Sequence, residues 1–141
     1  MTLRGIPMDD KLREMVMRHE GLSLMPYRCP KGKLTIGYGR NLESKGITEY
    51  EADMLLADDL KECLRDVEEI TQRLVMDNRT RALVDLRYQT GSYGFKTFVK
   101  MIAAILSRDW NRAADELMDS EYGRNFPKRA RELEGMLRTG D

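Results

Sequence analysis

An apolar stripe in the middle of the chain constrains the fold more than any other feature. Thr48 and Glu51 form a capping box, which is a typical start of a helix. Six apolar residues then recur at spacings of four and three, the period of one helical face: Leu56, Leu60, Cys63, Val67, Ile70 and Leu74. These features predict a bridging helix within about residues 48–75, with about 25 helical residues and a length of roughly 38 Å at 1.5 Å per residue. Its two ends have different neighbours, so it can join two lobes of a 141-residue chain.

The segment before the bridging helix predicts a helix and then a β-hairpin. Asp9 or Asp10 can cap the helix, and Gly21 suits the position just past its end, so Glu20 lies at a helix C-terminus. One face of this helix is expected to carry Leu12, Met15, Val16 and His19.

The hairpin is predicted to turn through residues 30–33. Leu34, Ile36 and Tyr38 then alternate with Thr35, Gly37 and Gly39, the period of a strand. Cys29 and Thr35 flank the turn and should be neighbours in space. The two glycines leave room for a ligand to approach the strand closely, although a twisted or bulged edge strand would explain them equally well.

Four helices are predicted after the bridging helix. The first begins at Asp77 or Asn78 and ends at residues 91–94, and the last begins at Pro127 and ends at Gly140. The predicted class is therefore α+β and mostly helical. A single domain over residues 1–141 would have lobes at about 9–47 and 78–141, with a cleft where they meet.

Composition excludes several kinds of function. Lys plus Arg and Asp plus Glu both number 24, and a chain without net charge is a poor candidate for a nucleic-acid binder. The longest apolar run, residues 101–106, is too short for a stable membrane insertion or a secretory signal. Two cysteines and one histidine predict neither a metal site nor a disulfide framework, and no cofactor is implied.

Glu20 is the first candidate for chemistry. The negative end of a helix dipole disfavours an ionised carboxylate, which raises its pKa toward that of a general acid. A glutamate before a glycine is also a common surface residue. The spacing adds to the case, because eight residues separate Glu20 from Cys29 and five separate Cys29 from Thr35.

The segment from His19 to Gly39, HEGLSLMPYRCPKGKLTIGYG, resembles the active-site segment of the T-even phage lysozyme family, glycoside hydrolase family 24. The signature of that family is a Glu, eight residues, an Asp or sometimes a Cys, five residues and a Thr, with a T-x-G-x-G strand. The resemblance continues through residues 82–91, 110–114 and 127–140, so it covers about residues 9–140. It implies a lysozyme-like fold and a muramidase acting on peptidoglycan.

The resemblance also implies roles for individual residues. Glu20 would protonate the leaving oxygen, while Cys29 and Thr35 would hold and activate water on the other face of the sugar, giving inversion. Arg129 matches an arginine that pairs with the catalytic glutamate and lowers its pKa. The positions that would line the cleft and bind substrate are Tyr88, Gln89 and Gly37.

Cys29 departs from the usual pattern, because the residue at this position is usually a carboxylate. A neutral thiol cannot stabilise a positive centre as a carboxylate does. Either Arg28, Lys31 or Lys33 lowers the thiol pKa, or Cys29 mainly positions water, or it is a spectator and Thr35 holds the water alone.

The implied biological role is that of a phage endolysin. It would remain in the host cytoplasm as a monomer and reach the peptidoglycan once a holin-type pore opens the inner membrane. One rival is a lysozyme-like protein that binds glycan with weak or no hydrolysis, because Cys29 replaces the carboxylate. Another is a helical interaction or nucleic-acid protein that uses the basic C-terminal helix, and a lytic transglycosylase is a third.

Overall fold

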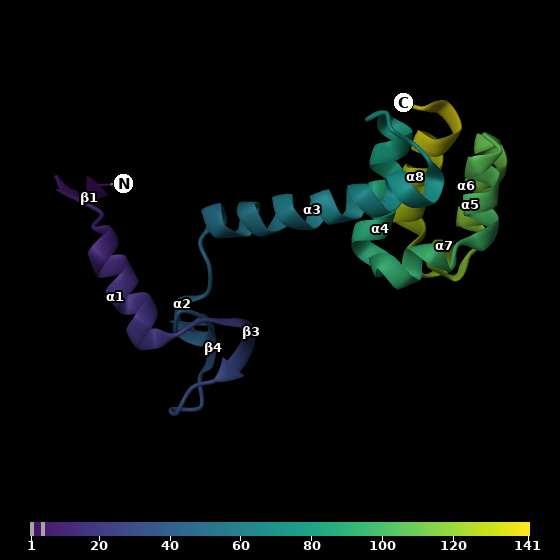
Figure 1. Ribbon diagram of the computed structural model, residues 1–141. Helices are drawn as coiled ribbons and strands as arrows, with labels where there is room; N and C mark the ends of the chain where they lie inside the picture. The colour runs from purple at the N-terminus through teal and green to yellow at the C-terminus, as the bar shows by residue number, and fades with distance from the viewer. Residues whose placement is uncertain (1, 4) are drawn as a thin grey trace. The chain divides into compact units, whose positions relative to one another are not determined.

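The computed structural model describes residues 2–3 and 5–141. The chain falls into two compact units, residues 1–52 and residues 53–141, which we describe separately. Figure 1 shows the order of the elements along the chain. The predicted class is confirmed: the fold is α+β, mostly helical, with a three-stranded sheet. That both units form one domain stays a prediction.

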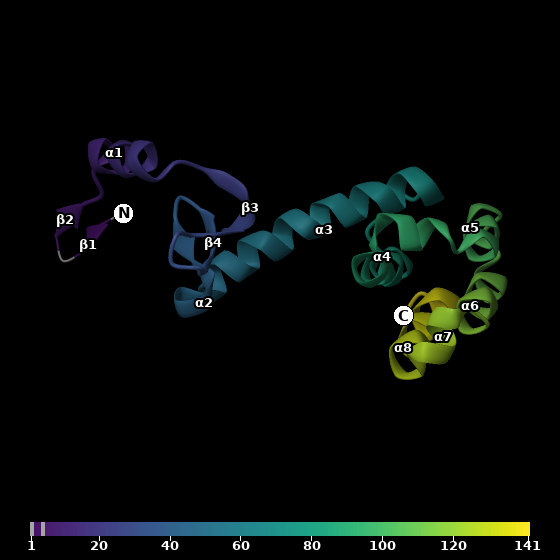
Figure 2. The ribbon, with the colours of Figure 1, turned by 90° about the horizontal axis from the view of Figure 1, so that it is seen from below.

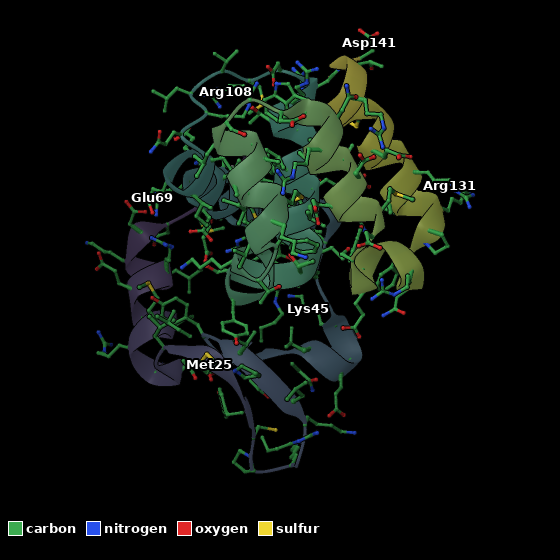
Figure 3. All side chains as sticks on the ribbon, turned by 90° about the vertical axis from the view of Figure 1, so that its right-hand side faces the viewer. Met25, Lys45, Glu69, Arg108, Arg131 and Asp141 are labelled. Carbon is green, nitrogen blue, oxygen red and sulfur yellow. The ribbon has the colours of Figure 1, made fainter. Side chains whose placement is uncertain are left out.

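The first unit contains a helix and a small sheet. The sheet has the order β3-β4-β5 with antiparallel neighbours, and Figure 2 shows β3 alongside β4. Thr35 lies on the central strand, paired with Tyr27 on one side and with Asn41 on the other. The elements are β1 (Thr2–Leu3), β2 (Ile6–Pro7), α1 (Asp10–Glu20), β3 (Ser23–Arg28), β4 (Leu34–Gly37), β5 (Arg40–Asn41), α2 (Leu42–Lys45) and the start of α3 (Glu49–Thr71).

Helix α1 has the predicted bounds. The Asp9 side chain accepts a hydrogen bond from the amide of Lys11, and Gly21 follows the helix with φ 71°. The predicted apolar face forms, but no side chain of α1 is buried: Leu12, Met15 and Val16 are 50%, 41% and 42% exposed. Within residues 5–52, only Thr35 is buried.

The bridging helix α3 begins as predicted. The amide of Glu51 donates to the Thr48 hydroxyl at 3.1 Å, and the amide of Thr48 donates to the Glu51 carboxylate at 2.9 Å, which completes the capping box. The predicted end at residue 75 is wrong. The helix ends at Thr71 because Gln72 takes φ 58°, and Leu74 beyond it is 82% exposed.

An ion pair between Arg40 and Glu51 ties β5 to the start of α3. The guanidinium donates two hydrogen bonds to the carboxylate, at 2.9 and 2.7 Å. Arg40 is the first cause that lowers the pKa of Glu51 to about 2, from an ordinary value of 4.5, and the Thr48 amide adds to it. Because the folded-state pKa is lowered, this stabilisation is complete above pH 4.5 and is lost as the pH falls to about 2.

We expect Glu51→Gln to lower the thermal midpoint of unfolding at neutral pH, and the difference from the unsubstituted protein to disappear near pH 2. Glutamine keeps the capping geometry, so this substitution isolates the charge. Glu49→Gln is the matched control, because it removes an exposed charge from the same helical turn. Equal effects of the two substitutions at every pH would contradict the role given to the ion pair.

The second unit is a helical bundle with a continuous core. In Figure 1, α5 lies beside α6, and α8 contacts both α4 and α6. Trp110 lies between two guanidinium groups, those of Arg73 and Arg79, each 4.7 Å from the centre of its ring. The helices are the rest of α3, α4 (Asn78–Lys96), α5 (Val99–Leu106), α6 (Trp110–Met118), α7 (Glu121–Asn125) and α8 (Pro127–Thr139). The core includes Val67, Leu83, Leu86, Phe95, Ile105, Leu117 and Leu137.

The four predicted helices correspond to α4, α5, α6 and α8. The helical path of α4 breaks at Gly91, which has φ 81° and ψ 170°, as the predicted stop at residues 91–94 implies, and a further helical stretch runs on to Lys96. The short elements β1, β2, β5, α2 and α7 were not predicted. They are two to five residues long, too short to show a hydrophobic period. Among the described residues, no helix has both the length and the apolar character that crossing a membrane requires.

Candidate active site

Glu20 is the last residue of α1, and its carboxylate lies against the backbone of the following sheet. The amide of Gly21 donates to the carbonyl of Met17 at 2.9 Å, which ends the helix and directs the chain toward β3. A Cβ atom added to Gly39 would stand 2.8 Å from Oε2 of Glu20. Glu20 is exposed and therefore open to a ligand. Gly39 is four residues after Thr35, so their Cα atoms are at most about 14 Å apart.

Cys29 and Thr35 are brought together by the hairpin, as the sequence predicts. The amide of Cys29 donates to the carbonyl of Lys33 at 2.9 Å, and the amide of Gly32 donates back to the carbonyl of Cys29 at 2.7 Å. This closes a tight turn over the predicted residues. Thr35 is 3% exposed, and its hydroxyl donates to the same Lys33 carbonyl at 2.8 Å.

Backbone amides surround the Cys29 sulfur. Hydrogen bonds from the amide of Lys33, and then from that of Lys31, lower the pKa of the thiol, and the Thr35 hydroxyl lowers it further. The turn therefore lowers the thiol pKa mainly through backbone dipoles.

Two of the three charged side chains that were candidates for lowering this pKa, Arg28 and Lys33, have another partner. Glu43 pairs with Arg28, and its second oxygen lies 3.9 Å from Nζ of Lys33. Glu43 also accepts a hydrogen bond from the amide of Leu34 at 3.0 Å. It therefore fixes the base of the hairpin, a role that sequence reasoning missed because nothing in the spacing relates Glu43 to the turn.

We expect iodoacetamide to modify Cys29 well before Cys63. When the rate of modification of Cys29 is measured against pH, it should reach half its maximum below pH 9.0, because the thiol pKa is lowered. Cys63 is 2% exposed, and burial raises its thiol pKa. Mass spectrometry of timed digests measures both sites. Cys29→Ser should abolish the fast labelling, whereas Cys63→Ala should leave it intact. Fast labelling at Cys63, or a Cys29 midpoint at or above pH 9.0, would contradict the assignment.

The other predicted residues lie in different surroundings. An apolar hollow of about 680 Å³ between α3, α4 and α8 includes both Tyr88 and Arg129, and Arg129 forms an ion pair with Asp85 at 2.8 Å. Gln89 is not part of that hollow; it accepts a hydrogen bond from Tyr122 at 2.7 Å. A Cβ atom at Gly37 would meet nothing within 4 Å, so the space there is open to a ligand. The pairing of Arg129 with Glu20 stays a prediction, as do the binding roles of Tyr88, Gln89 and Gly37.

The described residues hold no group of three or more His, Cys, Asp or Glu side chains placed to bind a metal ion. The side chains gathered around the hairpin are instead suited to acid–base chemistry and to holding water.

The sequence profile of the family described as Phage lysozyme matches residues 17–138. This chain belongs to the phage lysozyme family. Residues 17–138 contain the glutamate, the hairpin and the arginine discussed above. The family accounts for the fold class, and a lysozyme of this family is a glycoside hydrolase.

Three curated proteins are similar over nearly the whole chain. A probable T4-type lysozyme 2 of Dictyostelium discoideum is 24% identical, with 94% of this chain and 96% of that protein aligned. A second probable T4-type lysozyme of the same organism is 25% identical over the same shares. The pre-baseplate central spike protein Gp5 of Enterobacteria phage T4 is 27% identical over 99% of this chain, which spans 30% of that protein.

Proposed function

We propose that this member of the phage lysozyme family is a muramidase that hydrolyses the β-1,4 bond between N-acetylmuramic acid and N-acetylglucosamine in peptidoglycan. The observation that carries the proposal is the arrangement around the hairpin. The carboxylate of Glu20 rests against the turn that follows the strand of Thr35, and the amide of Cys29 and the hydroxyl of Thr35 both donate to the carbonyl of Lys33. Glu20, Cys29 and Thr35 all lie within the segment that matches the family.

In the proposed reaction, the protonated carboxyl of Glu20 gives its proton to the bridging oxygen as the bond from that oxygen to the sugar C1 breaks. A water molecule held by Thr35 and Cys29 forms the new bond to C1 from the opposite face, which inverts the configuration. The thiolate of Cys29 accepts the proton that the water loses. Exchange with solvent then moves a proton from the thiol back to Glu20, so the net change is the addition of one water molecule.

The experiment is digestion of purified peptidoglycan followed by mass spectrometry of the soluble fragments. The proposal predicts fragments with a reducing-end N-acetylmuramic acid. Anhydro-muramic products would indicate a lytic transglycosylase, and sedimentation with the wall without release of fragments would indicate a binding protein. Alkylation of Cys29 should lower the rate sharply; a fully active alkylated enzyme would give the thiol no catalytic part.

We further propose that the protein acts as an endolysin, as a monomer released from the host cytoplasm through a holin-type membrane pore. Family membership supports this role. Expression in a Gram-negative host tests it: turbidity should fall only after the inner membrane is permeabilised. Lysis without permeabilisation, or intact cells after it, would contradict the role but not the muramidase chemistry.

A further inference from the structure

The carboxylate of Glu20 lies beside the backbone of Gly39. From the sequence, Gly37 and Gly39 share one expected property, room for a ligand beside the chain. The structure separates them. An added Cβ would meet nothing within 4 Å at Gly37, whereas at Gly39 it would stand 2.8 Å from Oε2 and 3.4 Å from Cδ of Glu20. The space beside Gly39 is already occupied by the carboxylate.

We propose that Gly39 is a positioning residue, whose missing side chain lets the Glu20 carboxylate rest against the turn between β4, the strand that carries Thr35, and β5. This rests on the proposed function of Glu20 as the acid. Any larger residue at position 39 would place a Cβ atom 2.8 Å from Oε2, closer than the 3.0 Å within which real Cβ atoms essentially never approach. The carboxylate of Glu20 would then have to shift from its present place beside the turn.

The consequence for stability differs from the consequence for catalysis. The atom that Cβ would meet is the far end of a flexible, exposed side chain, which can rotate away at little cost to the fold. Gly39 also has φ +78°, so alanine there is strained whatever the space allows. A misplacement of a reacting group by about 1 Å can lower a rate ~10²-fold. Gly39→Ala should therefore lose much more activity than its loss of stability explains.

The first test is Gly39→Ala beside the control Gly46→Ala. Gly46 lies in the same unit and also has a positive φ, +61°, but a Cβ there would meet nothing within 4 Å. We expect Gly39→Ala to lower kcat ~10- to 100-fold with little change in KM. Gly46→Ala should shift the unfolding midpoint comparably but keep its kcat. Equal kcat losses in the two variants would overturn the proposal.

The second test is a double-mutant cycle with Glu20→Asp, which draws the carboxylate back by one methylene. If the alanine methyl acts by displacing this carboxylate, the losses from Gly39→Ala and Glu20→Asp will be less than multiplicative. If alanine acts only through backbone strain, the two losses will multiply, and the positioning role is refuted.

A third readout needs no catalysis. The carboxyl carbon resonance of Glu20, assigned by its loss in Glu20→Gln, should move in Gly39→Ala and not in Gly46→Ala. An inactive protein whose resonance moves as expected would refute the proposed function but keep the contact. If the protein is active but Gly39→Ala changes neither the Glu20 resonance nor kcat, the proposed function stands and the positioning role is refuted.

Discussion

Glu20→Gln should lower the rate of peptidoglycan hydrolysis by ~10²–10⁴, the range that a positioned general acid contributes. Glutamine has nearly the size of glutamate, so it can occupy the same place beside Gly39. It has no carboxyl proton to give to the leaving oxygen. The rate of fragment release from purified peptidoglycan measures the effect, and the unfolding midpoint shows whether the fold is retained.

Glu14→Gln is the control for this experiment. Glu14 is exposed on the same helix, and the structure places no site residue beside it. Its substitution removes the same charge and should leave the rate unchanged. If Glu20→Gln hydrolyses peptidoglycan at the unchanged rate, Glu20 is not the general acid, whatever family the chain belongs to.

The sequence predicted the parts of this site that depend on local order. The helix end at Glu20 follows from Gly21, and the approach of Cys29 to Thr35 follows from the turn between them, because both are set by neighbouring residues. The apolar stripe from Leu56 to Leu74 also located the long helix, but its last member, Leu74, lies beyond the helix end at Thr71. A left-handed Gln72 has no signature in the hydrophobic pattern.

Contacts between distant residues could not be predicted in the same way. The carboxylate of Glu43 reaches back to Arg28, and that of Glu51 reaches Arg40, only because the sheet has folded. Likewise, the source of the lowered thiol pKa could not be inferred from the basic residues near Cys29. The charges of these basic residues can be read from the sequence. The backbone amides that lower the thiol pKa cannot, because every residue except proline has an amide and only the folded turn directs particular ones toward the sulfur.

The largest effect on stability is expected at a partly buried ion pair in the second unit. The guanidinium of Arg87, whose side chain is 9% exposed, donates to the Asp66 carboxylate at 2.6 Å and to the Cys63 sulfur at 3.5 Å. Hydrogen bonding to Arg87 lowers the pKa of Asp66. The pair joins α3 to α4 beside the main core.

Asp66→Ala should reduce the free energy of unfolding by ~3–5 kcal/mol, because it leaves the Arg87 charge buried without its principal partner. Glu62 cannot replace Asp66, since its carboxylate is 3.4 Å from the guanidinium and its side chain is 67% exposed. Urea unfolding measures the loss. Asp58→Ala, an exposed aspartate of the same helix, should change the stability by no more than ~0.5 kcal/mol.

The double variant Asp66→Leu with Arg87→Met separates two explanations of that loss. If the cost of Asp66→Ala comes from an unpaired buried charge, removing both charges should recover most of the stability, since apolar side chains of similar volume often replace such a pair without penalty. If the cost comes from lost packing between α3 and α4, the double variant should be at least as unstable as Asp66→Ala. Recovery would show that the pair fixes how the two helices meet more than it stabilises them.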